Sequence, residues 1–86
     1  MIRSLAGKTP VIHPDAFVSE FAYVVGDVEI GEGSSVWPGC VIRGESKIVI
    51  GRFTCIQDNS TIHAERFRGN AEHYAELAAQ FKAEGL

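Results

Sequence analysis

The sequence predicts a mainly β protein, a parallel β-helix of about three coils with a C-terminal α-helix. Three observations predict this fold. A branched aliphatic residue recurs every six positions, a compact residue stands four positions after most of them, and the period changes near residue 70. A period of six fits neither an amphipathic helix nor an ordinary strand, which repeat at three to four and at two. Short strands joined by turns, three to a coil, instead form rungs that stack ~4.8 Å apart.

Residues 1–11 are predicted as a lead-in to the repeat, and the coils as 12–29, 30–49 and 50–65. The aliphatic residues that point inward are Ile12, Val18, Val24, Ile30, Val36, Ile42 and Ile48 and, after a shift of two residues, Ile50, Ile56 and Ile62. The compact residues that fit the corners are Ala16, Ala22, Val28, Ser34, Cys40, Thr54 and Ser60. A β-sandwich with chance spacing is the competing interpretation, and ten aliphatic residues in phase disfavour it.

The repeat is predicted to end near Arg66, because a charged side chain cannot pack inside a corner. Residues 66–69 are then a linker, and residues 70–86 a helix with Asn70 as its N-cap. An apolar stripe at helical spacing supports the helix, formed by Tyr74, Leu77, Ala78 and Phe81. We expect this helix to pack against the column or to cover one of its open ends.

Size and composition set the class of protein. A chain of 86 residues makes one small domain, and a net charge of −3 without a basic stripe argues against nucleic acid as a partner. No segment is apolar enough for a signal peptide or a membrane span. Cys40 and Cys55 form neither a CxxC pair nor a disulfide framework. We therefore expect a soluble, reduced, cytoplasmic protein.

The phase of the repeat also identifies side chains that point outward. On one face, His63 should lie one rung from Arg43, about 5 Å away, beside a ladder of carboxylates. Because stacked like charges are destabilising, we expect Arg43 to form an ion pair with Glu45, within or between subunits. The outward residues of this face are Val25, Arg43 and His63, followed by Asp27, Glu45 and Glu65.

Three aromatic side chains are also predicted to point outward. Phe21 and Trp37 share the adjacent face, and Phe53 lies on the third. A cluster of exposed aromatic residues on a small protein favours a closed homo-oligomer. Three flat sides fit a trimer. His13 and His73 are interpreted as surface residues.

The segments GDVEIGEGSSVWPGCVIRGESKIVIG and TCIQDNSTIH resemble the γ-class carbonic anhydrase family and its γ-like relatives. The similarity covers about residues 10–65, and EHYAELAAQFKAEGL resembles the closing helix of the family. VWPG, IRG and IQDNSxIH are specific only in combination. The resemblance implies a left-handed β-helix and a trimer with zinc between subunits.

The resemblance also assigns roles to individual residues. His63 matches the first zinc-binding histidine of the family, and Arg43 matches the arginine of an Arg-Gly-Asp or Arg-Ser-Asp motif that ties subunits together. Gln57 and Asp58 match polar residues beside the metal-bound water. The implied chemistry is hydration of carbon dioxide by a zinc-bound hydroxide.

This sequence departs from the family pattern at three places. Glu45 replaces the usual aspartate, and Cys55 stands where asparagine is common. The Gly-His…His-Gly segment that supplies the other two zinc ligands does not follow His63, as though the middle coils were lost. A catalytic zinc needs three protein ligands.

Three functions follow as hypotheses. The first is a truncated γ-carbonic-anhydrase-like protein without efficient carbon dioxide hydration, which acts as a structural or binding oligomer. The second is a metal-dependent carbonic anhydrase whose ligands are shared between subunits, with zinc as its cofactor. The third is a hexapeptide-repeat acyltransferase relative, which the absence of a longer column and of a cleft histidine disfavours.

Overall fold

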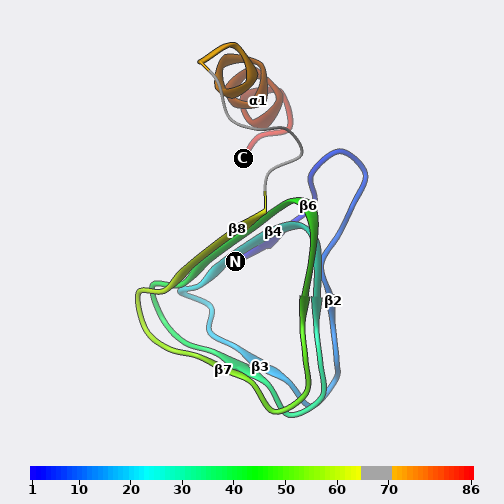
Figure 1. The fold of residues 1–86 in the computed structure, drawn as a ribbon, viewed down its shortest axis with the longest axis vertical. Coiled ribbons are helices and arrows are strands. Elements are labelled where there is room, and N and C mark those ends of the chain that lie inside the picture. The colour runs from blue at the N-terminus through cyan, green and yellow to red at the C-terminus, as the bar shows by residue number, and fades with distance from the viewer. Residues whose placement is uncertain (65–70) are drawn as a thin grey trace.

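The computed structural model describes residues 1–64 and 71–86, with side chains in the helix from residue 77 onward. Viewed along its axis the molecule is a triangular column with one helix outside it (Figure 1). The strands are β1 (Ile2–Arg3), β2 (Val11–Ile12), β3 (Phe17–Val18), β4 (Tyr23–Ile30), β5 (Ser35–Val36), β6 (Val41–Ile50), β7 (Cys55–Ile56) and β8 (Thr61–Ala64), and the helix is α1 (Ala71–Ala83). The predicted parallel β-helix of about three coils with a C-terminal helix is confirmed. Its left-handedness stays a prediction.

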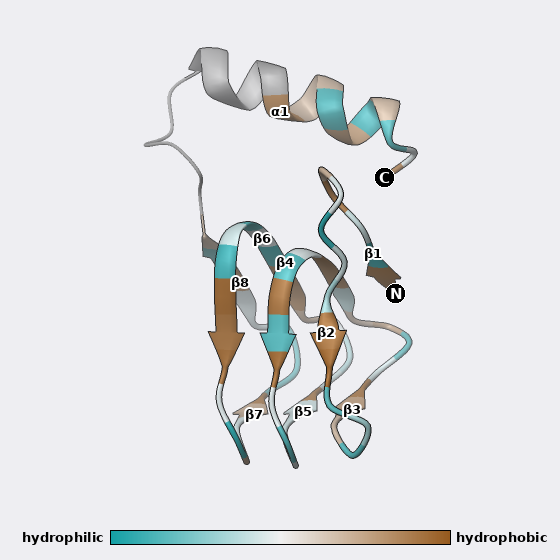
Figure 2. Ribbon diagram, turned by 90° about the vertical axis from the view of Figure 1, so that its right-hand side faces the viewer, coloured by the Kyte–Doolittle hydropathy of each residue, from teal (hydrophilic) through white to brown (hydrophobic). Residues whose placement is uncertain are grey.

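Every pair of named strands is parallel, and the strands of successive coils lie side by side (Figure 2). One sheet has the order β1-β4-β6-β8, with β2 also paired to β4, and the other has the order β3-β5-β7. The first residues of β4 pair with β1 and its last residues pair with β2. Both β4 and β6 therefore continue around a corner of the triangle and contribute to two of its sides.

The core is the set of inward aliphatic residues that the period of six identifies. Paired strands place these residues directly over one another, as in the row of Val18, Val36 and Ile56. A second row contains Val24, Ile42 and Ile62, and a third contains Ile12, Ile30 and Ile50. The inward residues of the middle coil are buried, as are Val24 and Val28 of the first coil. The partly exposed inward residues lie nearer the ends of the column and are Ile12, Val18, Ile56 and Ile62. Stacking of like side chains thus supplies the apolar burial that holds the coils together.

The shift of two residues in the sequence corresponds to an irregularity between β4 and β6. Gly26 pairs with Gly44, eighteen residues on, whereas Val28 pairs with Ile48, twenty residues on. The second coil is therefore two residues longer than the first at this corner. The backbone is tight here: Gly26 has a φ of +89°, and a Cβ at this position would lie 2.4 Å from the Gly44 carbonyl oxygen.

Helix α1 lies beside the column, outside the side that contains β4, β6 and β8, and not across an end (Figures 1 and 2). Of the two placements expected from the sequence, packing against the column is the one observed. Leu77 is buried, and the Ala6 N–H donates to the Glu84 carboxylate at 3.1 Å. The predicted linker 66–69 and the predicted cap Asn70 lie outside the described residues, as do Glu65, Arg66 and the side chains of His73 and Tyr74.

Two features differ from the sequence-based expectation. Part of the predicted lead-in is a strand, because Ile2 and Arg3 of β1 pair with Val24 and Val25. Val25, expected to point outward, is fully buried, as is Leu5, although neither belongs to the central core. The N-terminal loop projects at one corner of the column, and α1 lies outside the side that contains β4, β6 and β8 (Figure 1). The outward position of Val25 is thus covered by segments that lie outside the six-residue repeat.

Candidate functional site

Arg43, Glu45 and His63 form a polar cluster on the side of the column next to α1. Arg43 on β6 and His63 on β8 are register partners, as the phase of the repeat predicts. Glu45 lies two residues beyond Arg43, within the stretch of β6 where the register shifts. The local lengthening of the coil brings its carboxylate to the same two side chains.

The three side chains are in direct contact. Arg43 Nε lies 2.6 Å from Glu45 Oε2, and His63 Nε2 lies 3.0 Å from Glu45 Oε1. Arg43 Nη2 lies 2.8 Å from His63 Nε2. The predicted ion pair between Arg43 and Glu45 is confirmed within one chain. Glu45 is not part of an exposed carboxylate ladder, because its side chain is fully buried, whereas those of Arg43 and His63 are 31% and 23% exposed.

A buried carboxylate needs a cation and hydrogen bonds to offset its desolvation. Arg43 supplies the cation, although the angle between Arg43 Nε and Glu45 Oε2 is not that of a hydrogen bond. His63 supplies a hydrogen bond when its Nε2 carries a proton. Removing Arg43 would leave the Glu45 charge buried with a histidine as its remaining partner in the cluster.

His63 Nε2 has two neighbours with opposite requirements. It can accept a hydrogen bond from Arg43, or it can carry a proton and donate to Glu45. It cannot do both at once. In either state the nitrogen is engaged inside the cluster.

We tested whether these residues fit the zinc ion that the family resemblance implies. A catalytic zinc site uses three protein ligands and one open position. The cluster offers one imidazole and one carboxylate, and the Arg43 guanidinium lies at hydrogen-bond distance from the imidazole nitrogen. No group of three or more His, Cys, Asp or Glu side chains that could hold a metal occurs within the described part of the chain. The described residues of one chain therefore do not fit a catalytic zinc.

The other predicted site residues lie on different parts of the column. Gln57 and Asp58 are exposed in the turn after β7, and within the described chain no contact joins them to the cluster. Phe21 and Trp37 point outward as predicted, 73% and 40% exposed. Sequence reasoning missed Phe17, which is half-exposed and whose ring centroid lies 5.1 Å from that of Trp37. Phe17 precedes the inward Val18, so the alternation of strand side chains was the available signal.

A groove of about 400 Å³ separates the cluster from the helix. Arg43 lines one side of it and lies 6.0 Å from the centre of the Phe81 ring. The other lining residues belong to the C-terminal segment and are Leu77, Ala78, Lys82 and Leu86. Sequence reasoning placed Phe81 on an apolar stripe but did not connect it with Arg43.

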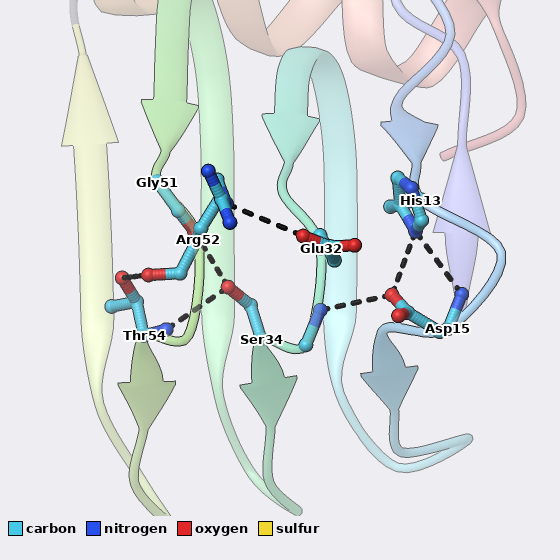
Figure 3. A network of polar contacts seen from close by, with 8 residues as sticks. His13, Asp15, Glu32, Ser34, Gly51, Arg52 and Thr54 are labelled. Atoms are coloured by element: carbon cyan, nitrogen blue, oxygen red, sulfur yellow. Dashed lines mark hydrogen bonds and ion pairs between the residues drawn. The ribbon is translucent and has the colours of Figure 1, made fainter.

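A second polar network ties the coils together at another corner (Figure 3). Asp15 accepts a hydrogen bond from the Gly33 N–H at 2.9 Å and lies 2.7 Å from His13 Nδ1. The Gly33 hydrogen bond, with a smaller contribution from His13, lowers the pKa of Asp15. The buried Ser34 hydroxyl donates to the Gly51 carbonyl at 2.6 Å. These contacts link successive coils, and His13 is a surface residue as predicted.

Comparison with known proteins gives a consistent result. Residues 9–44 match the family described as bacterial transferase hexapeptide (six repeats). The chain is 48% identical over 66 residues to gamma carbonic anhydrase 2, mitochondrial, of Arabidopsis thaliana. These 66 residues are 76% of this chain and 24% of the relative. It is 47% identical over 64 residues to a carbonic anhydrase of Geobacillus kaustophilus, and this match covers 73% of this chain and 35% of the relative. A crystal structure of a hexapeptide transferase family protein from Anaplasma phagocytophilum has a TM-score of 0.60 at 30% identity, covering 70% of this chain and 48% of that one.

The stacked coils and these matches define a hexapeptide-repeat β-helix protein. Within that class, the chain is similar to proteins named gamma carbonic anhydrase and carbonic anhydrase. It spans only about a quarter to a third of the length of the curated relatives that it matches. No helix of the described chain is long and apolar enough to cross a membrane.

Proposed function

We propose that this chain is a shortened γ-carbonic-anhydrase-like subunit that does not hydrate carbon dioxide efficiently and acts as a structural or binding oligomer. The proposal rests on the contacts that His63 makes with Arg43 and Glu45. Its Nε2, the nitrogen nearest to the other two groups, lies 2.8 Å from Arg43 and 3.0 Å from Glu45. Arg43 and His63 therefore stabilise a buried carboxylate, a role that needs no metal.

The outward aromatic residues support the oligomeric part of the proposal. Phe17, Phe21 and Trp37 lie toward the same corner of the column and expose apolar surface. Because such clusters are rare on small monomeric proteins, we infer that they pack against a second copy of the chain. The γ-class resemblance favours a trimer, in which Arg43 and Glu45 also lie near a neighbouring subunit. A cytoplasmic location stays a prediction.

Two measurements on the purified chain test this proposal. Light scattering coupled to size-exclusion chromatography should give the mass of a trimer. After incubation with zinc and removal of excess metal, the chain should retain much less than one zinc per subunit, and it should not accelerate carbon dioxide hydration in a stopped-flow assay. The curated Geobacillus carbonic anhydrase is the positive control for the assay.

The opposite result would identify the alternative function. Stoichiometric zinc with measurable hydration, both lost in His63→Ala, would mean that neighbouring subunits complete the ligand set. The proposed structural or binding role would then be wrong, and the chain would be a metalloenzyme.

A further inference from the structure

The groove between the polar cluster and α1 combines an apolar wall with positive charge. Arg43 lines it from β6, and Lys82 lines it from the last turn of α1. Within the part of the chain that the structure describes, no carboxylate side chain lines the groove. Its volume of about 400 Å³ is in the range of small-molecule binding sites. The apolar lining residues are Leu77, Ala78, Phe81 and Leu86.

Arg43 is held in place by the other two residues of the cluster. Its Nε lies 2.6 Å from Glu45 Oε2, and its Nη2 lies 2.8 Å from His63 Nε2. Nε is buried, yet 31% of the side chain stays exposed. Neither of these two contacts uses Nη1, which carries two N–H donors. Because its partners already fix the guanidinium, an anion that binds it has little side-chain freedom to remove.

The balance of charge at the groove favours a ligand with a single negative charge. The Glu45 carboxylate offsets the charge of Arg43. Lys82 adds one positive charge, and its side chain is exposed. A dianion such as a phosphate monoester would need a further cation to balance it. A carboxylate carries one charge, and its planar geometry matches that of a guanidinium.

The apolar stripe of α1 supplies the other half of the site. Leu77 is buried, whereas Ala78 is exposed and Phe81 is partly exposed, so the column covers the stripe only in part. The centre of the Phe81 ring lies 6.0 Å from the Arg43 guanidinium carbon. An anionic head group on Arg43 would therefore place an attached apolar chain next to Phe81. Ala78 has a single methyl group as its side chain, so a larger residue at this position would occupy the groove.

We propose that this groove binds a small monocarboxylate with an apolar body. The carboxylate contacts Arg43 and Lys82, and the apolar body covers the exposed surface of Ala78 and Phe81. This inference goes beyond the proposed function, because it concerns a groove within one chain. It requires neither a trimer nor the absence of zinc. Either proposal can therefore fail without the other.

Octanoate is the probe for this site, and octanol and acetate lack its charge and its apolar chain, respectively. In NMR titrations of isotope-labelled protein, octanoate should shift the backbone amide signals of residues 77–86. Octanol should bind at least about tenfold more weakly, because a hydrogen bond to a charged group contributes roughly that factor. Acetate should also bind more weakly, because it covers little apolar surface. Equal binding of octanoate and octanol, or no binding of octanoate, would overturn the proposal.

Ala78→Phe tests where octanoate binds. The added ring would fill the groove, so octanoate should bind at least about tenfold more weakly, through loss of its apolar contacts. Ala79→Phe is the matched control, because Ala79 is the next residue of α1, is also exposed and is not among the groove's lining residues. It should bind octanoate as wild type does. Equal affinities of the two variants, with folding verified by circular dichroism, would place the ligand elsewhere and overturn the proposal.

Lys82→Gln tests the charge without filling the groove. Lys82 is exposed and glutamine is a good helix former, so the fold should be retained. Octanoate should bind about threefold more weakly, because an exposed cation contributes modestly. Octanol should bind as it does to wild type. Unchanged octanoate affinity, or equal losses for octanoate and octanol, would contradict recognition of the carboxylate by Lys82 and overturn the proposal.

Discussion

Arg43 and Glu45 retain different amounts of contact with water, and this difference predicts unequal effects of removing each charge. Glu45 is fully buried, whereas Arg43 is 31% exposed. Arg43→Met should therefore lower the free energy of unfolding by about 3–5 kcal/mol, because an uncompensated carboxylate stays buried. Glu45→Gln should lower it by only about 1–2 kcal/mol, because Arg43 can turn toward water and glutamine keeps a hydrogen-bonding group. Chemical denaturation at one fixed protein concentration measures both values.

An exposed ion pair provides the control for this comparison. Lys47 and Glu29 lie 2.9 Å apart, with side chains 54% and 45% exposed. Lys47→Met should change the free energy of unfolding far less than Arg43→Met, because water screens this pair. Similar losses for the two substitutions would mean that the burial of Glu45 does not set the energetics of the cluster.

At the scale of single residues, the sequence predicted which residues lie side by side better than it predicted how deeply each is buried. The period of six placed His63 beside Arg43, and they are register partners. It also suggested an exposed row of carboxylates, but Glu45 is buried. The reason is that a period distinguishes inward from outward positions. It does not report a change of register or a segment that covers the outer face.

At the scale of elements, the corner shared by β4 and β6 depends on glycine. Gly26→Ala would place a Cβ 2.4 Å from the Gly44 carbonyl oxygen at a φ of +89°. We expect the free energy of unfolding to fall by about 3 kcal/mol or more, through backbone strain and a clash with main chain that cannot move aside. Thermal and chemical denaturation measure this loss.

Gly51 is the matched control for this substitution. It lies immediately after the last residue of β6, without a positive φ, and an added Cβ would meet no atom within 4 Å. Gly51→Ala should leave stability unchanged or raise it slightly, because alanine restricts the unfolded chain. A large loss at Gly51, or none at Gly26, would contradict this account of the corner.

The elements also differ in how well the sequence predicts them. The aliphatic series gave the strands of the three coils, and the shift at Ile48 and Ile50 corresponds to the register change between β4 and β6. β1 was missed because its Ile2 lies ten residues before Ile12 and outside the series. Helical spacing indicated α1 but not which side of the column it contacts, since that depends on tertiary packing.

At the scale of the whole molecule, the exposed aromatic residues predict which surface would hold the proposed oligomer together. Phe21 is 73% exposed and Phe53 is 70% exposed, so neither contributes much to the fold of one subunit. If the surface near Trp37 is the subunit interface, Phe21→Ser should convert the trimer to monomers, because the interface loses an apolar anchor. Phe53→Ser, at a different corner, should leave the trimer intact. Masses from light scattering at equal concentration distinguish these outcomes. Dissociation by Phe53→Ser alone would mean that the interface lies at the corner of Phe53. If neither substitution causes dissociation, the exposed aromatic residues do not hold the subunits together.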